Sequence, residues 1–259
     1  MAASPNYFAH ATAAERYARG RPYHHPSVVR RIAEVTGRTR FSSALDVGCG
    51  TGQSTMAIAD IAELVVGIDV SAEMLARAIH LPNASFHLAA AEMLPFADRS
   101  FDLVTVGMAF HWLEQSKFLA EARRVLFEDG WLAIYNSGFL GELEEAPDFS
   151  RWYRDVYLTR YPWPPRAESG VSEELAGSLG FTFVQRELVT QGIPMSAEEF
   201  VRYHLTQSNV IAKVEQATEK VEMVAQFLSE AVAPYFHSGH RTLCWQSTID
   251  FLRPRRLAG

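Results

Sequence analysis

Several features that would place this chain outside the ordinary globular class are missing from its sequence. Two of its 259 residues are cysteines, which favours a reducing compartment over a framework of disulfides. No apolar run reaches the roughly 18 residues that a membrane-spanning helix needs. The N-terminus also lacks the apolar segment of a secretory signal. We therefore expect a cytoplasmic protein with no membrane partner.

Clustered basic charge and recognised metal spacing are missing as well. The net charge is −6 and the arginines are scattered, so the sequence shows no footprint for nucleic acid. Two pairs of histidines, His24 with His25 and His237 with His240, lack nearby cysteine or carboxylate ligands at zinc spacing. We expect neither a nucleic-acid partner nor a bound metal.

What is present is an ordinary globular composition, with 48% hydrophobic and 21% charged residues. The length suits one large domain or two small ones, and no repeat or low-complexity linker divides it. We predict a single domain over residues 1–259. Its parts are an N-terminal helical cap (1–40), a core (41–138), helical insertions (139–180 and 191–241) and two last strands (181–190 and 242–252).

The rest of the chain is organised around residues 44–55, which read as an apolar strand, a glycine-dense turn and the start of a helix. Gly48, Gly50 and Gly52 occupy alternate positions, so a ligand can approach the backbone closely. The following helix directs its free N–H groups and its positive dipole end at this place. A nucleotide-like ligand is the first hypothesis, and a purely structural turn is the alternative.

The spacing of the glycines narrows the class of ligand that the turn could bind. A dinucleotide site has the pattern G-x-G-x-x-G, but here Gly52 follows Gly50 by two positions. Asp46 also precedes Gly48 by two positions, where a dinucleotide site usually has no acid. This D-x-G-x-G-x-G turn resembles motif I of the class I S-adenosylmethionine (SAM) dependent methyltransferases, in which the loop holds the methionine end of SAM.

A second acid ends the apolar strand expected over 64–69. Asp69 lies 17 residues after Gly52, close to the offset of about 20 residues at which an acid meets ribose hydroxyls. A carboxylate can accept both hydrogen bonds of a vicinal diol. The alternative is that Asp69 helps to start the next helix, for which Ser71 is a good N-cap.

Apolar strand patterns alternate with helical patterns over residues 41–135, which predicts a parallel, doubly wound sheet. The expected strands cover 41–47, 64–69, 84–88, 100–107, 130–135, 181–190 and 242–252. The expected helices cover 52–61, 72–79, 115–127, 196–206 and 213–233.

Four motifs in this order are more specific than one glycine loop. Together they resemble the class I methyltransferases, in particular the branch that includes ubiquinone-biosynthesis methyltransferases, and they cover residues 45–52, 67–71, 91–96 and 100–104. Further stretches are similar to the trans-aconitate methyltransferase-like subgroup, namely 17–23, 110–113 with Phe118, and 121–126. The resemblance implies a Rossmann-like, doubly wound α/β fold. Its seven-stranded sheet would be mostly parallel with the last strand antiparallel, and helical insertions would cover the substrate.

The resemblance also implies SAM as cofactor and assigns residues to it. The glycine turn would frame methionine, Asp69 would hold the ribose, and the ends of strands three and four would meet adenine, the methyl group and the substrate. The implied cofactor-binding residues are Tyr17, Arg21, Asp46, Gly48, Gly50, Gly52, Gln53, Asp69, Val70, Ala91, Glu92, Met108 and Phe110.

One position departs from the family pattern. The residue before Ala91 is commonly an acid that accepts a hydrogen bond from the adenine amino group, whereas this chain has Ala90. Either a backbone group or Glu92 takes that contact, or the affinity for adenine is lower.

Methyl transfer from SAM is a displacement in which the enzyme mainly aligns the acceptor and excludes water. A carboxylate acceptor needs no general base. A phenol, amine or carbon acid would benefit from one, and His111 is the best-placed candidate. The alternative for His111 is a packing or SAM-orienting role beside Trp112.

The acceptor itself is left open by the sequence. Arg21 or the arginines of 151–166 could pair with an acidic substrate, although most exposed arginines are simply solvated. Tyr17 and Tyr23 could close over SAM and favour its sulfonium through their ring faces. We predict a SAM-dependent methyltransferase, monomeric or homodimeric, that acts on a small molecule, with a carboxylic acid as the candidate acceptor. The alternatives are a non-catalytic SAM-binding regulatory protein and an NAD(P)-dependent oxidoreductase.

Overall fold

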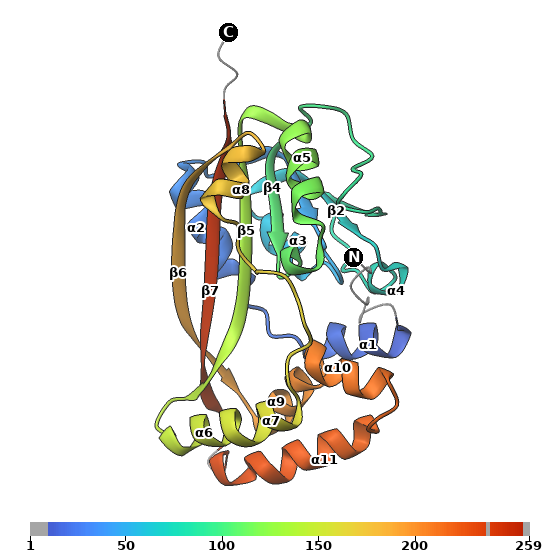
Figure 1. Cartoon of the computed structure of the whole chain (residues 1–259), viewed down its shortest axis with the longest axis vertical. Helices are drawn as coiled ribbons and strands as arrows, with labels where there is room; N and C mark the ends of the chain where they lie inside the picture. Colours follow the sequence, from blue (N-terminus) through green and yellow to red (C-terminus); the bar gives the residue numbers. More distant parts are fainter. Residues whose placement is uncertain (1–9, 237–238, 256–259) are drawn as a thin grey trace. The chain divides into compact units, whose positions relative to one another are not determined.

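A computed structural model describes residues 10–236 and 239–255 of the chain. Within them, seven strands form one sheet in the order β3-β2-β1-β4-β5-β7-β6 (Figure 1). β1 pairs in parallel with β2 and β4, β2 with β3, and β4 with β5. One strand of the sheet is antiparallel. The predicted Rossmann-like α/β fold is therefore confirmed.

The first four strands lie within two residues of their expected bounds, and the last three are longer than expected. The strands are β1 (Phe41–Val47), β2 (Ala62–Asp69), β3 (Ala84–Leu88), β4 (Phe101–Gly107), β5 (Leu126–Leu143), β6 (Phe181–Met195) and β7 (Arg241–Pro254).

The extensions of β5 and β6 correct the predicted insertion boundaries, because residues 139–143 and 191–195 are strand rather than helix. In β5, Gly141 has a φ of 79°, and a Cβ there would lie 2.5 Å from the Tyr153 ring. This glycine therefore permits close packing rather than a turn. In β6, Pro194 lacks an N–H group, which an edge strand tolerates, and β6 is last in the strand order.

Eleven α-helices are present in the described part of the chain. They are α1 (Ala11–Gly20), α2 (His25–Thr36), α3 (Gln53–Ile58), α4 (Ala72–Leu75), α5 (Gln115–Val125), α6 (Pro147–Trp152), α7 (Leu158–Arg160), α8 (Glu173–Ser178), α9 (Ala197–His204), α10 (Ser208–Glu215) and α11 (Val221–Val232). Shorter turns are the 3₁₀ helices η1 (Phe110–Trp112) and η3 (Ala233–Tyr235) and the π-helix η2 (Tyr153–Tyr157).

The single helix predicted over 213–233 is wrong. Ala217 has a φ of 54°, a left-handed conformation that ends a right-handed helix, and the chain forms α10 before it and α11 after it. The apolar spacing carries on across this break, so the pattern alone did not reveal it. No described helix combines the length and apolar character that crossing a bilayer would require.

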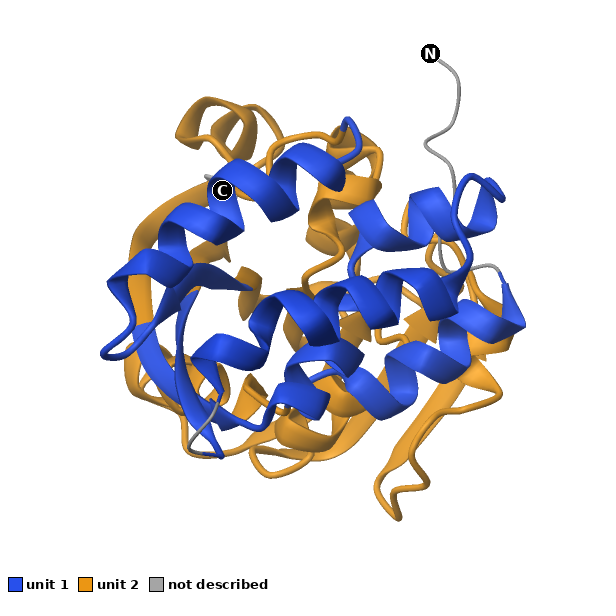
Figure 2. Cartoon of the chain, turned by 90° about the horizontal axis from the view of Figure 1, so that it is seen from below, with its two compact units in different colours: residues 1–22, 138–165, 190–246 blue, residues 23–137, 166–189, 247–259 orange. Residues whose placement is uncertain are grey.

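By its internal contacts the chain divides into two compact units (Figure 2). The first unit consists of residues 1–22, 138–165 and 190–246, and the second of residues 23–137, 166–189 and 247–259. The expected N-terminal cap is divided between them, since α1 belongs to the first unit and α2 to the second; its residues 1–9 lie outside the described part. The single domain predicted from the sequence stays a prediction.

The second unit buries apolar side chains on both faces of its strands. Val28 and Ile32 of α2 cluster with Ala44 of β1 on one face, whereas Phe118 of α5 clusters with Leu45 on the other. Neighbouring residues of β1 thus enter different cores, as expected for a sheet covered on both faces.

The first unit has an aromatic core. Its helices α1 and α9 approach closely at Gly20, where a Cβ would lie 2.6 Å from the carbonyl oxygen of Arg202. The largest buried side chains of its core cluster are aromatic, and they are Phe149, Tyr153, Tyr157, Tyr161, Phe200, Tyr203 and Trp245.

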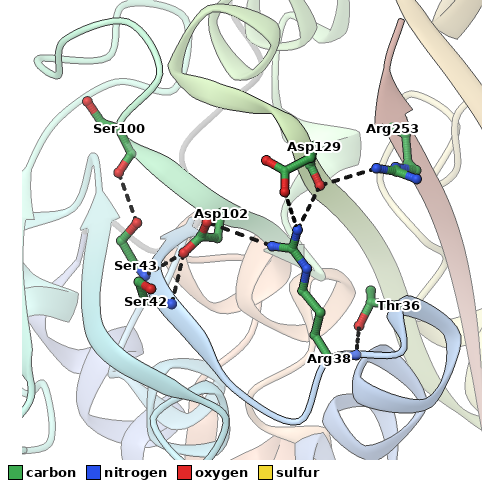
Figure 3. Close-up of polar contacts among 8 residues, drawn as sticks. All are labelled: Thr36, Arg38, Ser42, Ser43, Ser100, Asp102, Asp129 and Arg253. Atoms are coloured by element: carbon green, nitrogen blue, oxygen red, sulfur yellow. Dashed lines mark hydrogen bonds and ion pairs between the residues drawn. The ribbon is translucent and has the colours of Figure 1, made fainter. Parts of the chain in front are cut away.

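Paired charges hold the amino ends of β1, β4 and β5 together in the second unit (Figure 3). The carboxylate of Asp102 accepts hydrogen bonds from the backbone N–H groups of Ser42 (2.8 Å) and Ser43 (3.1 Å). Arg38 forms ion pairs with both Asp102 and Asp129. At this end of the sheet, these carboxylates therefore have a cationic partner.

Candidate functional site

The glycine turn lies at the carboxyl end of β1. Gly48, Gly50 and Gly52 have φ values of 69°, 55° and 84°, which side chains other than glycine rarely adopt. A Cβ on Gly48 would lie 2.4 Å from that of Ala109. A Cβ on Gly50 would meet only the flexible end of Met74, at 3.0 Å, among the described residues. Packing inside the protein thus accounts for Gly48, while Gly50 leaves room for another group.

Asp46 is fully buried directly before this turn. Its carboxylate accepts hydrogen bonds from the hydroxyls of Ser54 (2.6 Å), Thr55 (2.7 Å) and Thr105 (3.0 Å). Burial raises the pKa of Asp46 to about 6, against the opposing effect of the three hydroxyls. Asp46 therefore fastens the turn to α3 and β4 through neutral donors.

The three hydroxyl donors were missed by the sequence analysis, although a signal for them exists. Ser54 and Thr55 directly follow the glycine turn, and Thr105 is the one polar residue in the inner part of an apolar strand. Buried hydroxyls need partners, so their presence so close to Asp46 could have suggested the cluster.

Asp69 lies at the carboxyl end of β2. Its contacts bear on both roles predicted for it, which are to bind the ribose and to start the next helix. One carboxylate oxygen accepts a hydrogen bond from Gly50 N (2.9 Å), and the other accepts one from Ser71 N (2.8 Å). Ser71 in turn caps α4 by accepting from Met74 N (3.2 Å). Burial raises the pKa of Asp69, and the backbone N–H groups oppose that shift. Each oxygen keeps a second lone pair that can accept from a ligand.

The residues predicted to meet adenine follow β2 and β3. Val70 is 59% exposed, and Ala91 is buried. One oxygen of Glu92 accepts a hydrogen bond from Glu114 N (2.9 Å). Whether Glu92 or a backbone group replaces the acid missing at Ala90 stays a prediction.

An ion pair on α5 clamps the loop that follows these residues. Glu121 accepts a hydrogen bond from Leu94 N (2.7 Å), and Arg124 donates to the carbonyl oxygens of Leu94 (2.9 Å) and Phe96 (2.6 Å). Arg124 also pairs with Glu121 at 2.7 Å. In the sequence these two residues stand out only as part of a family resemblance, because a clamp between distant segments has no local signature.

Three predicted residues follow β4. Met108 has a φ of 57° and donates its N–H to the carbonyl oxygen of Tyr135 (2.8 Å). A left-handed backbone is uncommon for residues other than glycine, and the residues that adopt it are often found at functional sites. Phe110 is 1% exposed and packs edge-on against Phe118. Phe110 therefore packs in the core, and its predicted contact with the cofactor stays a prediction.

His111 is buried, and its ring centroid lies 4.6 Å from that of Trp112. This contact matches the packing alternative for His111, while its role as a base stays a prediction. His237, considered and set aside as a metal ligand, lies outside the described residues.

The structure brings most of the predicted cofactor residues together in the second unit. Gln53 begins α3 there. Tyr17 and Arg21 belong to the first unit, where the guanidinium of Arg21 lies 4.7 Å from the Tyr17 ring centroid and donates to the carbonyl oxygen of Thr206 (3.0 Å). Their contact with a cofactor stays a prediction.

The electrostatics of the second-unit cluster suit a cationic ligand with hydroxyl groups. Asp46 and Asp69 are held by neutral donors, and neither forms an ion pair with another residue that the structure describes. Buried charges are normally paired. A sulfonium compound with a ribose diol, such as SAM, would supply both the missing positive charge and the donors.

Comparison with known sequences identifies the same region. A family model described as a methyltransferase domain matches residues 45–134. An uncharacterized methyltransferase of Synechocystis is 37% identical over 160 residues, which are 57% of this chain and 70% of that protein. A malonyl-[acyl-carrier protein] O-methyltransferase of Hamiltonella defensa is 34% identical over 134 residues, 51% of this chain and 52% of that protein. The chain also spans about half the length of the curated mycobacterial relatives that it matches.

Solved structures share the fold over nearly the whole chain. A candidate type II methyltransferase from Anaeromyxobacter dehalogenans superposes with a TM-score of 0.68 at 24% identity and covers 92% of this chain and 99% of its own. A phosphoethanolamine N-methyltransferase of Haemonchus contortus, solved with S-adenosylhomocysteine, has a TM-score of 0.53 at 18% identity and covers 95% of this chain and 58% of its own. The family of the chain follows from the sequence relatives, since the Synechocystis protein is 37% identical and is matched over 70% of its length. The chain therefore belongs to the class I SAM-dependent methyltransferase family.

Proposed function

We propose that the second unit binds SAM at the glycine turn and that the protein transfers its methyl group to a small carboxylic acid. The observation that carries this proposal is a pair of carboxylates, the buried Asp46 and the half-buried Asp69, that face neutral donors beside a turn of left-handed glycines. Bound SAM would supply an electrophilic methyl group and a positive charge.

Each part of the site has a proposed task. Asp69 accepts from the ribose hydroxyls through its remaining lone pairs. Asp46 keeps the turn in place and contributes negative charge near the sulfonium, and Gly50 leaves the backbone accessible. Glu92 offers its second oxygen to the adenine amino group.

A carboxylate acceptor is compatible with a packing role for His111, since it needs no deprotonation. A carboxylate is already ionised at neutral pH, so no general base is required, and the buried contact of His111 with Trp112 is then sufficient to explain that residue. The name of the Hamiltonella relative, an O-methyltransferase, agrees with transfer to oxygen. The motifs similar to the trans-aconitate methyltransferase-like subgroup support a small free acid.

The proposal includes a reducing, cytoplasmic compartment and a monomer or homodimer. Cys49 and Cys244 are both free thiols, which fits that compartment. A SAM-binding regulator without turnover is the second candidate, because Ala90 removes a usual adenine contact. The oxidoreductase alternative loses its support with the family assignment.

Calorimetry with S-adenosylhomocysteine, with NAD as control, tests the cofactor. We expect binding of S-adenosylhomocysteine and none of NAD. Tritium transfer from labelled SAM to a panel of small di- and tricarboxylic acids then tests the acceptor, with the matching amides as controls. Binding without transfer to any panel member would favour the regulator, and absence of binding would refute the whole proposal.

A further inference from the structure

The segment that joins β3 to β4 lies entirely in the second unit and contains no helix or strand over residues 89–100. We call it the β3–β4 loop. Segments of this kind are usually mobile, because few hydrogen bonds fix their backbone. This loop carries Ala91 and Glu92, the residues predicted to meet adenine. What holds its shape therefore bears on cofactor binding.

The guanidinium of Arg124, on α5, uses every donor that it has. Nε and Nη2 donate to the two carboxylate oxygens of Glu121, at 2.9 and 2.7 Å. Nη2 also donates to the carbonyl oxygen of Leu94 (2.9 Å), and Nη1 donates to the carbonyl oxygen of Phe96 (2.6 Å) and to Asp98 Oδ1 (3.0 Å). A guanidinium has five N–H donors, so all five have acceptors. Arg124 is therefore a fixed tie rather than a solvated surface charge.

The ion pair also takes up the polar backbone groups around Pro95. Leu94 N donates to Glu121 Oε2 (2.7 Å), and the carbonyl oxygens of Leu94 and Phe96 accept from Arg124. Pro95 has no N–H group, and its ring restricts its φ. The backbone on both sides of Pro95 is thus held in one conformation by two side chains of α5.

α5 holds the loop near its beginning as well. Glu114 N, at the start of the helix, donates to one carboxylate oxygen of Glu92 (2.9 Å). Glu114, Glu121 and Arg124 share one face of α5, because they are spaced by seven and three residues. The apolar residues of α5 are fully buried in the core of the second unit. The loop is therefore fastened along a helix that is itself firmly packed.

We propose that Glu121 and Arg124 are positioning residues for the base of the cofactor, and that they make the site selective for adenine through the β3–β4 loop, without touching the cofactor. This inference rests on the proposed binding of SAM in the second unit. It holds whether Glu92 or a backbone group of the loop accepts from the adenine amino group.

The physical reason is pre-organisation. A site built around a hydrogen bond rejects an analogue that cannot form it. That selectivity is weakened when the acceptor is mobile, because ordering it on binding costs free energy. Hypoxanthine has a carbonyl oxygen where adenine has its amino group, so it cannot donate at that position. Discrimination between the two bases should therefore depend on the ion pair of Glu121 and Arg124.

A second ion pair in the same unit provides a matched control. Arg186 donates to both carboxylate oxygens of Asp250 and to the carbonyl oxygen of Val171 (3.1 Å). Asp250 in turn accepts from Val171 N (2.8 Å). This arrangement has the same chemistry, since a guanidinium and a carboxylate hold the N–H and C=O groups of one loop residue. None of its members belongs to the proposed cofactor site.

Calorimetry on the full chain with S-adenosylhomocysteine and S-inosylhomocysteine, its hypoxanthine analogue, tests the inference. The wild-type protein should prefer S-adenosylhomocysteine by about tenfold or more. Arg124→Met should weaken binding of S-adenosylhomocysteine about tenfold and binding of the analogue less than about twofold. Arg186→Met should lower the thermal midpoint as Arg124→Met does, yet leave both affinities within about twofold.

Two further variants separate charge from geometry. Arg124→Lys keeps the positive charge but replaces the planar fork by one nitrogen, so it should restore only part of the preference for adenine. Glu121→Gln replaces Arg124→Met if that variant does not fold. Its amide oxygen can still accept from Leu94 N, but the ion pair is lost, so the preference should fall about threefold.

Three results would overturn the inference. If Arg124→Met keeps the wild-type preference, or weakens both ligands by the same factor, the ion pair only stabilises the fold. Equal binding of the two ligands by the wild-type protein would show that the site does not read the amino group. If the wild-type protein does not bind S-adenosylhomocysteine, the proposed function itself fails, and the inference fails with it.

Discussion

Two aspartates at opposite ends of the parallel strands of the second unit have contrasting surroundings. Asp102, at the amino end of β4, accepts two backbone N–H groups and faces Arg38. Asp46, at the carboxyl end of β1, accepts three hydroxyls and meets no cation in the described structure. The first arrangement satisfies its charge within the protein, and the second leaves charge for a ligand to neutralise.

The contrast teaches that the number of hydrogen bonds does not distinguish a structural carboxylate from a functional one. Both aspartates are well bonded. What differs is the nearby charge: a guanidinium lies beside Asp102, whereas Asp46 has hydroxyl donors, and burial raises the pKa of Asp46. A buried acid with neutral partners costs folding free energy, which a cationic cofactor can return on binding.

The largest effect that we expect on cofactor affinity should occur only for a variant at the carboxyl end of the strands. Asp69→Ala removes the ribose acceptor and the bond to Gly50 N, so we expect the affinity for S-adenosylhomocysteine to fall about 100-fold, or about 2.7 kcal/mol, by calorimetry. Asp102→Ala is the matched control at the amino end. It should lower the free energy of unfolding in urea by about 2 kcal/mol and leave the affinity unchanged. Equal affinity losses in the two variants would abolish the distinction between the ends.

Two glycines with nearly the same φ lie near the two ends of β1, so they allow the same substitution to be compared at both ends. Gly37, which precedes β1, has a φ of 65°, and a Cβ there would meet no described atom within 4 Å, whereas Gly48 has a φ of 69° and a Cβ there would clash with Ala109. Gly37→Ala should cost about 1 kcal/mol of unfolding free energy, from strain alone. Gly48→Ala should cost about 1–3 kcal/mol more, measured in the same denaturant titration. Equal losses of unfolding free energy in the two variants would show that the backbone at Gly48 can shift away from Ala109.

The remaining prediction is that the contribution of Asp46 to stability depends on pH. Its folded pKa of about 6 lies above the ordinary value of 3.8, so the folded state holds the proton more tightly. This contribution to stability is present below about pH 4 and is lost as the pH rises to about 6. Asp46→Asn removes the titration, so without cofactor it should match the wild type near pH 4 and exceed it by about 3 kcal/mol well above pH 6, as a shift of about two pKa units requires.

Calorimetric unfolding across this pH range checks the prediction. Addition of SAM should reverse the order above pH 6, because the ionised carboxylate favours the sulfonium. A stability difference that does not vary with pH would mean that Asp46 titrates normally.

The second unit was predictable because its signals are local. The glycine turn, the acids two residues before it and at the end of β2, and the alternation of strands and helices each arise within a short stretch of sequence. Asp69 shows the limit of such signals, since one residue both caps the following segment and borders the glycine turn.

The features that were missed depend on contacts between distant segments. The clamp of Glu121 and Arg124 joins α5 to a loop about 30 residues earlier. The core position of Phe110 depends on Phe118, and the extension of β5 on the packing of Tyr153 against Gly141. Spacing along the chain carries no information on these pairings, and the break at Ala217 is a backbone choice that the apolar pattern conceals.

The strand order has a consequence for synthesis on the ribosome. β7 is made last but lies between β5 and β6. Until residues 241–254 emerge, β6 has no neighbour in the sheet and the edge of β5 remains open. A nascent chain that stalls before this point would expose unpaired strand edges, which are sites of aggregation. The strand β7 thus closes the sheet. Chaperones that cover open strand edges would be needed most before residues 241–254 have been synthesised.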